Sequence, residues 1–124
     1  MKATQPTCLT LNVRKTASAE NPLFQHLVLD SPEWSWTPGQ FVMLRPQKWE
    51  LDPFSGRPFS IADQDQEGLH IRYQVVGKAT RQMTALQPGD PITVWGPLGT
   101  GFTLEPETPT LLLAGGMGII PFVG

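Results

Sequence analysis

The sequence predicts a mainly β fold, a small six-stranded antiparallel Greek-key barrel with one short helix, followed by the truncated start of an α/β unit. Three observations favour this class. The 124 residues include 12 glycines and 13 prolines, the two residues least compatible with a helix interior. Hydrophobic residues make up 40% of the chain, which is enough to bury a core. Short apolar segments alternate with turn-forming residues at the spacing typical of small barrels.

Three strands are expected in the first half of the chain. Apolar and polar residues alternate over residues 9–14, which is the period of a β-strand. A second strand is expected over residues 23–30, because prolines and other turn formers flank it on both sides. A third is expected over residues 40–45, directly after the turn-forming sequence of residues 37–39.

Three further strands and the helix are expected in the second half. Residues 57–62 read as a short strand, closed by a polar loop at residues 63–68. Residues 69–75 alternate cleanly between apolar and polar types, and residues 92–96 form the sixth strand. Between these two, residues 78–86 lack glycine and proline, and their apolar members recur at helical spacing, which predicts a helix of about two turns.

The last twenty residues differ in kind from the rest. Residues 105–109 are polar and contain proline, as a linker would, and residues 110–114 are a continuous apolar run of the kind found in buried parallel strands. A glycine-rich turn containing Gly115, Gly116 and Gly118 follows at once. A strand that enters such a turn opens a nucleotide-binding βα unit. We therefore expect residues 1–104 to form the barrel and residues 105–124 to begin a second domain.

Composition argues against several classes of function. The net charge is −2 and basic residues occur at most in pairs, so a nucleic-acid partner is not expected. The apolar C-terminal segment is too short and too rich in glycine and proline to span a membrane. No basic segment followed by an apolar run marks a signal peptide, and we expect a cytoplasmic location.

Cys8 is the only cysteine of the chain. One cysteine cannot form an internal disulfide, a paired-cysteine zinc site or an iron–sulfur cluster within these residues. No metal site is therefore expected, and a [2Fe–2S] cluster is possible only beyond residue 124. We expect Cys8 to be a small buried strand residue.

The segment Arg57-Pro58-Phe59-Ser60 combines groups that suit a ligand with a phosphate and a flat ring. Arginine binds phosphate with two parallel hydrogen bonds, an aromatic ring packs on a planar group, and a serine hydroxyl both donates and accepts. The proline confines the strand to an edge or a bulge, where a ligand can approach. A surface strand with one buried phenylalanine remains the alternative.

Two glycine-containing segments carry further signals. A helix start at residues 77–81 presents free backbone N–H groups, and the basic Lys78 and Arg81 in its first turn favour an anion. The sequence of residues 96–102 has three glycines that permit close approach of a ligand to the backbone. Solvated side chains at the first segment and a plain connector at the second remain alternatives.

The order of these segments resembles the ferredoxin–NADP reductase superfamily. The match comprises the Arg-Pro-Phe-Ser segment, then Gly-Lys-Ala-Thr at residues 77–80, the glycine-rich loop at residues 96–102 and the glycine turn at residues 115–121. Leu51-Asp52-Pro53 and the run Gly-Pro-Leu-Gly-Thr-Gly-Phe most resemble the electron-transfer subunits of class 1B dihydroorotate dehydrogenases, which act in pyrimidine biosynthesis.

The resemblance implies a barrel that binds FAD, followed by a domain that binds NAD(P)H. It implies that Arg57 holds the pyrophosphate, that Phe59 packs on the flavin or ribityl part, and that Ser60 lies near flavin N5 as the catalytic residue. The cofactor-binding residues that it implies are Arg57, Pro58, Phe59, Ser60, Tyr73, Gln74, Val75, Gly77, Lys78, Ala79 and Thr80. It places Gly115, Gly116 and Gly118 in the NAD(P)-binding site.

Two positions depart from the superfamily pattern. Residue 79 is Ala where Gly is usual, which tightens the approach of a phosphate to the backbone, and residue 59 is Phe where Tyr is common, which removes a hydroxyl. The sequence is thus interpreted as the FAD-binding domain of a reductase. Its electrons would pass from NAD(P)H through FAD to an iron–sulfur centre on a catalytic dehydrogenase subunit or another redox partner. Other reductase subunits of this type, for a hydrogenase or an oxygenase, and a non-catalytic ligand-binding barrel are the alternatives.

Overall fold

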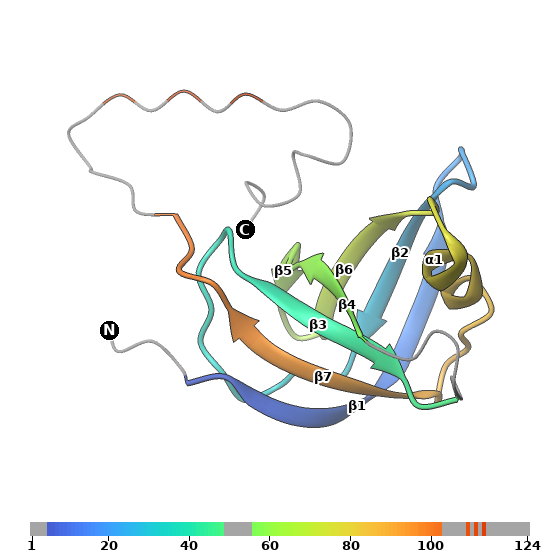
Figure 1. Ribbon diagram of the computed structural model, residues 1–124, viewed down its shortest axis with the longest axis horizontal. Coiled ribbons are helices and arrows are strands. Elements are labelled where there is room, and N and C mark those ends of the chain that lie inside the picture. Colours follow the sequence, from blue (N-terminus) through green and yellow to red (C-terminus); the bar gives the residue numbers. More distant parts are fainter. Residues whose placement is uncertain (1–4, 49–55, 103–108, 110, 112, 114–124) are drawn as a thin grey trace.

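The computed structural model describes residues 5–48, 56–102, 109, 111 and 113 of the chain. Their elements follow one another in the order β1 (Thr7–Ser18), β2 (Phe24–Leu29), β3 (Phe41–Pro46), β4 (Arg57–Ser60), β5 (Asp63–Gln64), β6 (Leu69–Gln74), α1 (Lys78–Met83) and β7 (Pro91–Leu98). The mainly β class with one short helix is therefore confirmed (Figure 1).

The strands form one curled antiparallel sheet in the order β4-β3-β7-β1-β2-β6-β5. The long strand β1 joins its two halves, because residues 7–12 pair with β7 and residues 13–18 pair with β2. The sheet curls until β4, at one end of this order, contacts β6 near the other end (Figure 1). The result is a half-open barrel.

Two consecutive residues connect the ends of the curled sheet. The backbone N–H of Ile61 donates to the carbonyl of Gln40 beside β3, and the next N–H, from Ala62, donates to the carbonyl of His70 on β6. Both side chains are buried, at 1% exposure each. This crossing ends β4 at Ser60, two residues earlier than expected.

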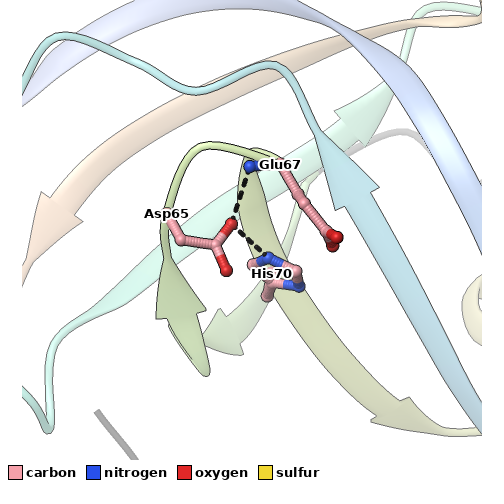
Figure 2. Close-up of side chains that lie close together, drawn as sticks. All are labelled: Asp65, Glu67 and His70. Carbon is pink, nitrogen blue, oxygen red and sulfur yellow. Dashed lines mark hydrogen bonds and ion pairs between the residues drawn. The ribbon is translucent and has the colours of Figure 1, made fainter.

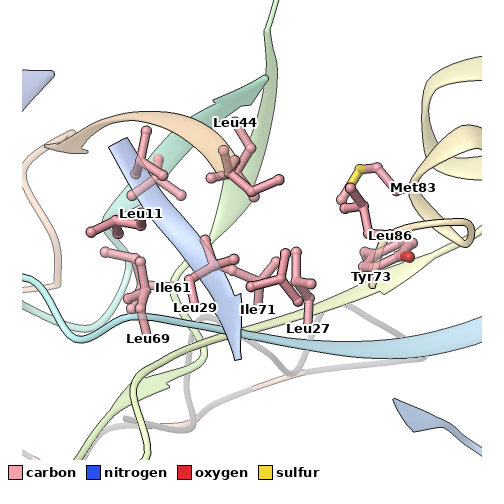
Figure 3. Close-up of a cluster of buried hydrophobic side chains, with 14 of the residues drawn as sticks. Leu11, Leu27, Leu29, Leu44, Ile61, Leu69, Ile71, Tyr73, Met83 and Leu86 are labelled. Carbon is pink, nitrogen blue, oxygen red and sulfur yellow. The ribbon is translucent and has the colours of Figure 1, made fainter. Parts of the chain in front are cut away.

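The core fills the concave side of the sheet (Figure 3). On β6 the inward residues Leu69, Ile71 and Tyr73 are buried, as the alternation predicted. Leucines from β1, β2 and β3 meet them, and Met83 and Leu86 cover one end of the cluster from α1 and the turn after it (Figure 3). Burial of this apolar surface is the main stabilising contribution to such a fold.

The structure differs from the expected elements in two details. The sheet has seven strands, not six, because Asp63 and Gln64 pair with His70 and Leu69 where a loop was expected. The α-helix ends at Met83 instead of residue 86. The next three residues continue in tighter turns, in which each N–H donates to the carbonyl three residues earlier, so Leu86 still reaches the core.

The prediction that Cys8 is buried is wrong. Cys8 is exposed, and it lies on β1 opposite Trp95 of β7, which is 50% exposed. Both residues belong to the outer face of the barrel, since their sequence neighbours Leu9 and Val94 pack toward the core.

Most of the C-terminal segment lies outside the described residues. This holds for Gly115, Gly116 and Gly118 and for the greater part of the predicted strand at residues 110–114. Within that strand only Leu111 and Leu113 are described; they are 80% and 79% exposed and lie in no strand. Among the described residues, no helix is long and apolar enough to cross a membrane.

Candidate functional site

An open cleft of about 570 Å³ lies between β4, the second half of β6 and the start of α1. Its walls exist because two strand edges are left without a partner. Among the described residues, β4 pairs only with β3, and β5 pairs only with Leu69 and His70 of β6. The backbone edges of β4 and of residues 72–74 therefore border the cleft without a strand between them.

The β4 wall carries the predicted Arg-Pro-Phe-Ser segment. Arg57 and Pro58 are exposed, and Phe59 and Ser60 are half-buried. Pro58 is tolerated because its strand is the end strand of the sheet, as expected for a proline in a strand. Among the described residues, no side chain or backbone group bonds the Ser60 hydroxyl, which leaves it available to a ligand.

The aromatic rings of Phe59 and Tyr73 join the two walls. Their centroids are 5.9 Å apart and their planes are inclined at 69°, an edge-to-face contact of the kind that aromatic pairs prefer. Tyr73 is only 5% exposed, and burial raises the pKa of its phenol to about 12. The phenol is therefore neutral at physiological pH.

The hydroxyl of Thr80 organises the loop that leads into α1. Its oxygen accepts hydrogen bonds from the backbone N–H groups of Val76 at 2.9 Å and Gly77 at 3.0 Å, and it donates to the Gly77 carbonyl at 3.2 Å. Thr80 is 9% exposed. These bonds fix the backbone where the helix begins. The N–H groups of the first helical turn have no partner within the helix.

Gly77 leaves room in the cleft that no atom of the described residues fills. Its backbone is extended, with φ −162° and ψ −172°, a conformation open to any residue. A Cβ placed on Gly77 would meet nothing within 4 Å. Gly77 is the N-cap of α1, a position where glycine is preferred to alanine. The open space beside it also admits a ligand that lies against the backbone.

The cleft is cationic in a chain of net negative charge. Three of its twelve lining residues are the cations Arg57, Arg72 and Lys78, and none is a carboxylate. The whole chain has a net charge of −2. Positive charge gathered in a concave site attracts anionic ligands.

The cleft brings together the predicted cofactor-binding residues with one exception. Val75 does not line it; Val75 packs against the core, and its backbone N–H donates to the Leu23 carbonyl at 2.7 Å. Sequence reasoning missed two lining residues, Arg72 and Val76. Strand alternation places Arg72 on the same face as Gln74, but only the folded chain shows that this part of β6 borders the cleft.

The expectation that the glycines of residues 96–102 serve ligand approach is not supported, because none of these residues lines the cleft. A Cβ on Gly96 would lie 2.7 Å from Cγ1 of Val42, and one on Gly101 would lie 2.8 Å from Cβ of Thr37. Gly101 also has a positive φ of +72°. These glycines are explained by close packing of the protein on itself.

A hydrogen-bonded cluster joins His26 of β2, His70 of β6 and the turn between β5 and β6, and none of these residues lines the cleft. Figure 2 shows Asp65, Glu67 and His70. Nε2 of His70 lies 2.8 Å from Oδ1 of Asp65, and Nε2 of His26 lies 2.9 Å from Nδ1 of His70. Because a carboxylate only accepts, we assign the proton of His70 to Nε2, so that His26 donates to Nδ1. The carboxylate also accepts from the backbone of Glu67 and Gly68, so the cluster fixes the turn between β5 and β6.

Comparison with known proteins finds relatives in both sequence and structure, although no family model matches the chain. The electron transfer subunit of dihydroorotate dehydrogenase B (NAD(+)) from Clostridium acetobutylicum is 40% identical over 92 residues, which are 73% of this chain and 37% of that protein. The ferredoxin reductase in carbazole 1,9a-dioxygenase superposes with a TM-score of 0.80 at 20% identity, over 99% of this chain and 39% of that one.

A third relative was solved with its cofactors. The ferredoxin NADP+ reductase from Neisseria gonorrhoeae with bound FAD and NADP superposes with a TM-score of 0.69 at 22% identity, over 94% of this chain and 49% of that one. The chain spans less than half the length of each of these three proteins.

The fold and the sequence point to the same group of proteins. The barrel has the same fold as these ferredoxin reductases, as the order of the sequence motifs indicated. Within that group, the sequence is similar to the electron transfer subunits of dihydroorotate dehydrogenase B. The resemblance expected from the sequence is confirmed at both levels.

Proposed function

We propose that this chain is the FAD-binding barrel of a flavin-dependent NAD(P)H oxidoreductase, and that the longer protein is the electron-transfer subunit of a dihydroorotate dehydrogenase. The observation that carries the proposal is the cleft between β4, β6 and α1. It combines exposed cations, an aromatic wall, an available hydroxyl and an open space beside Gly77. A dinucleotide with a flat ring system and two phosphates has the chemistry to fill it.

The proposed roles follow from what each side chain offers. The guanidinium of Arg57 holds the diphosphate, since arginine matches phosphate oxygens with two parallel hydrogen bonds. Phe59 packs against the flavin or ribityl part, and Tyr73 and Gln74 line the flavin from β6. The start of α1, from Gly77 to Thr80, holds the diphosphate from the other side with its backbone and with Lys78.

Bound FAD would supply hydride acceptance from NAD(P)H and one-electron transfer, which no side chain of this protein can perform. The chain's own contribution is to bind and orient. The Ser60 hydroxyl would hold a hydrogen bond to the reactive nitrogen of bound flavin. The half-open barrel leaves the cleft accessible to the nicotinamide and to a redox partner.

The remaining assignments belong to the longer protein. We place Gly115, Gly116 and Gly118 in the NAD(P)-binding site. We infer an iron–sulfur centre or a catalytic dehydrogenase subunit as the electron acceptor, and a location in the cytoplasm. The name of the relatives, electron transfer subunits of a dehydrogenase, supports a redox partner of this kind.

The proposal is tested by mixing the purified chain with excess FAD and removing free cofactor by desalting. We expect the protein fraction to retain visible flavin absorption and to quench flavin fluorescence. The Cys8→Ser variant serves as a control, because Cys8 is exposed and lies outside the cleft lining. A colourless protein fraction with full fluorescence in the filtrate would overturn the proposal.

A further inference from the structure

We propose that Arg72 is a further ligand-binding residue of the cleft and that its guanidinium contacts a phosphate of the bound flavin nucleotide. This inference rests on the proposed function. It concerns a residue that no motif singles out and that only the folded chain brings to the site.

Arg72 lies in the part of β6 that borders the cleft. The inward neighbours on either side of it, Ile71 and Tyr73, are buried at 0% and 5% exposure, and Arg72 itself is exposed. Arg72 lines the same cleft as Arg57 on β4 and Lys78 on α1. The cleft therefore receives one cation from each of the three elements that form it.

Arg72 also lacks the partner that comparable cations have. Arg14 pairs with Asp30 at 3.1 Å and Lys48 pairs with Asp90 at 2.8 Å. Within residues 5–48 and 56–102, no hydrogen bond or ion pair involves the side chain of Arg72, and its cross-strand neighbour on β2 is His26, not a carboxylate. An exposed guanidinium at the wall of a cleft without carboxylates is available to an anionic ligand.

Arginine suits this role better than a generic positive charge. Its planar guanidinium presents five donors in a fixed arrangement that matches the oxygens of a phosphate, and it stays charged at every physiological pH. A flavin nucleotide brings one phosphate in FMN and two in FAD. Arg57 and Arg72, from the two walls, would then bind the same anionic part of the ligand.

The test is a set of binding titrations with FAD, FMN and riboflavin on the wild-type chain and on Arg72→Ala, with Lys15→Ala as the control. Lys15→Ala removes the same charge from an exposed residue that does not line the cleft. We expect Arg72→Ala to weaken FAD binding by about tenfold to a hundredfold, as for other charge-assisted hydrogen bonds. Riboflavin has no phosphate, and its binding should match that of the control.

The FMN measurement identifies the phosphate that Arg72 contacts. If FMN weakens with FAD, Arg72 binds the phosphate next to the ribityl chain; if only FAD weakens, it binds the phosphate next to the adenosine. Arg72→Lys should recover part of the lost affinity, because it restores the charge without the planar donor pattern.

Two results would overturn the inference while leaving the proposed function intact. One is FAD affinity in Arg72→Ala equal to that in Lys15→Ala. The other is a loss of riboflavin binding as large as the loss of FAD binding, which would place Arg72 at the ring. If the wild-type chain bound none of the three flavins, both the proposed function and the inference would fall.

Discussion

At the scale of single residues, a methyl group added at Gly77 should affect the binding of a ligand more than the stability of the fold. The backbone conformation of Gly77 is open to alanine and its Cβ position is empty. Gly77→Ala should therefore change the free energy of unfolding little, because the restriction of the unfolded chain by alanine is offset by a poorer N-cap for α1. The same methyl group would occupy the space beside a bound diphosphate, so FAD affinity should fall.

Thermal unfolding and FAD titration of the same variant check this prediction. Gly89→Ala is an unsuitable control, since Gly89 has a φ of +97°; Ala85→Gly is better, because it makes the reverse change at an exposed position beyond the α1 helix. Unchanged FAD affinity in Gly77→Ala would show that no ligand lies against this backbone.

Arg57→Ala should weaken FAD binding by about 1.5–3 kcal/mol, the contribution of a hydrogen bond to a charged group. Arg57 is an exposed side chain, so the change should alter stability little. Isothermal titration of wild type and variant gives the difference directly. Equal FAD affinities of the wild type and the variant would show that Arg57 does not bind the cofactor.

At the scale of elements, the loop into α1 depends on one hydroxyl. Thr80→Val keeps the shape of the side chain and removes three hydrogen bonds at a position that is 9% exposed. Two backbone N–H groups would lose their acceptor, and the expected loss of stability is about 1–3 kcal/mol. FAD affinity should fall as well, because the loop lines the cleft.

The matched control is Thr84→Val, which makes the same substitution at the other end of the helix. The Thr84 hydroxyl is exposed and makes a single bond, to the Arg81 carbonyl at 2.6 Å. Chemical denaturation of the two variants should show the larger loss for Thr80→Val. Equal losses would mean that the bonds of Thr80 contribute nothing beyond an exposed threonine.

The strand pair β2–β6 should make stability depend on pH through His26. Burial, followed by the nearby charge of Arg72, lowers the pKa of His26 to about 4 from 6.5. As the pH falls from 6.5 toward 4, His26 takes up a proton in the unfolded chain but stays neutral in the folded chain. The free energy of unfolding therefore decreases. The partial exposure of this side chain limits the loss to about 1–2 kcal/mol.

His26→Gln keeps an N–H donor for His70 and removes the titration. Urea denaturation at pH 7 and at pH 4.5 should show a smaller decrease for the variant than for wild type. The carboxylates with lowered pKa values, Asp65 and Asp90, lose their contribution only as the pH falls below the usual carboxyl range. Parallel pH dependences of the two proteins would contradict the role of His26.

At the scale of the whole molecule, patterns that depend on repetition were predictable from the sequence. The alternation over residues 69–75 predicted the strand β6 and its inward residues, but not the burial of His70 on the other face. The two-residue strand β5 was not predictable, because it forms by pairing with β6 and is too short to show a period. The crossing at Ile61 and Ala62 likewise depends on the curl of the sheet.

The site residues that belong to a sequence motif were predictable. The site residues that come together only through folding were not. One cleft is lined by both predicted motifs, residues 57–60 and residues 77–80, as the motif order implied. Arg72 joins them only because the sheet brings β6 to face β4. The glycines of residues 96–102 were predicted to serve ligand approach, but they allow close packing within the protein. The sequence does not distinguish the two, because both require a residue without Cβ.

FAD bound in the cleft between β4, β6 and α1 would be located by an FAD titration followed with backbone amide NMR. We expect FAD-dependent shifts of the amide signals of Phe59, Tyr73 and Gly77, and unchanged signals for Cys8 and Trp95 on the outer face. Shifts confined to the outer face, or none at saturating FAD, would contradict binding of FAD in this cleft.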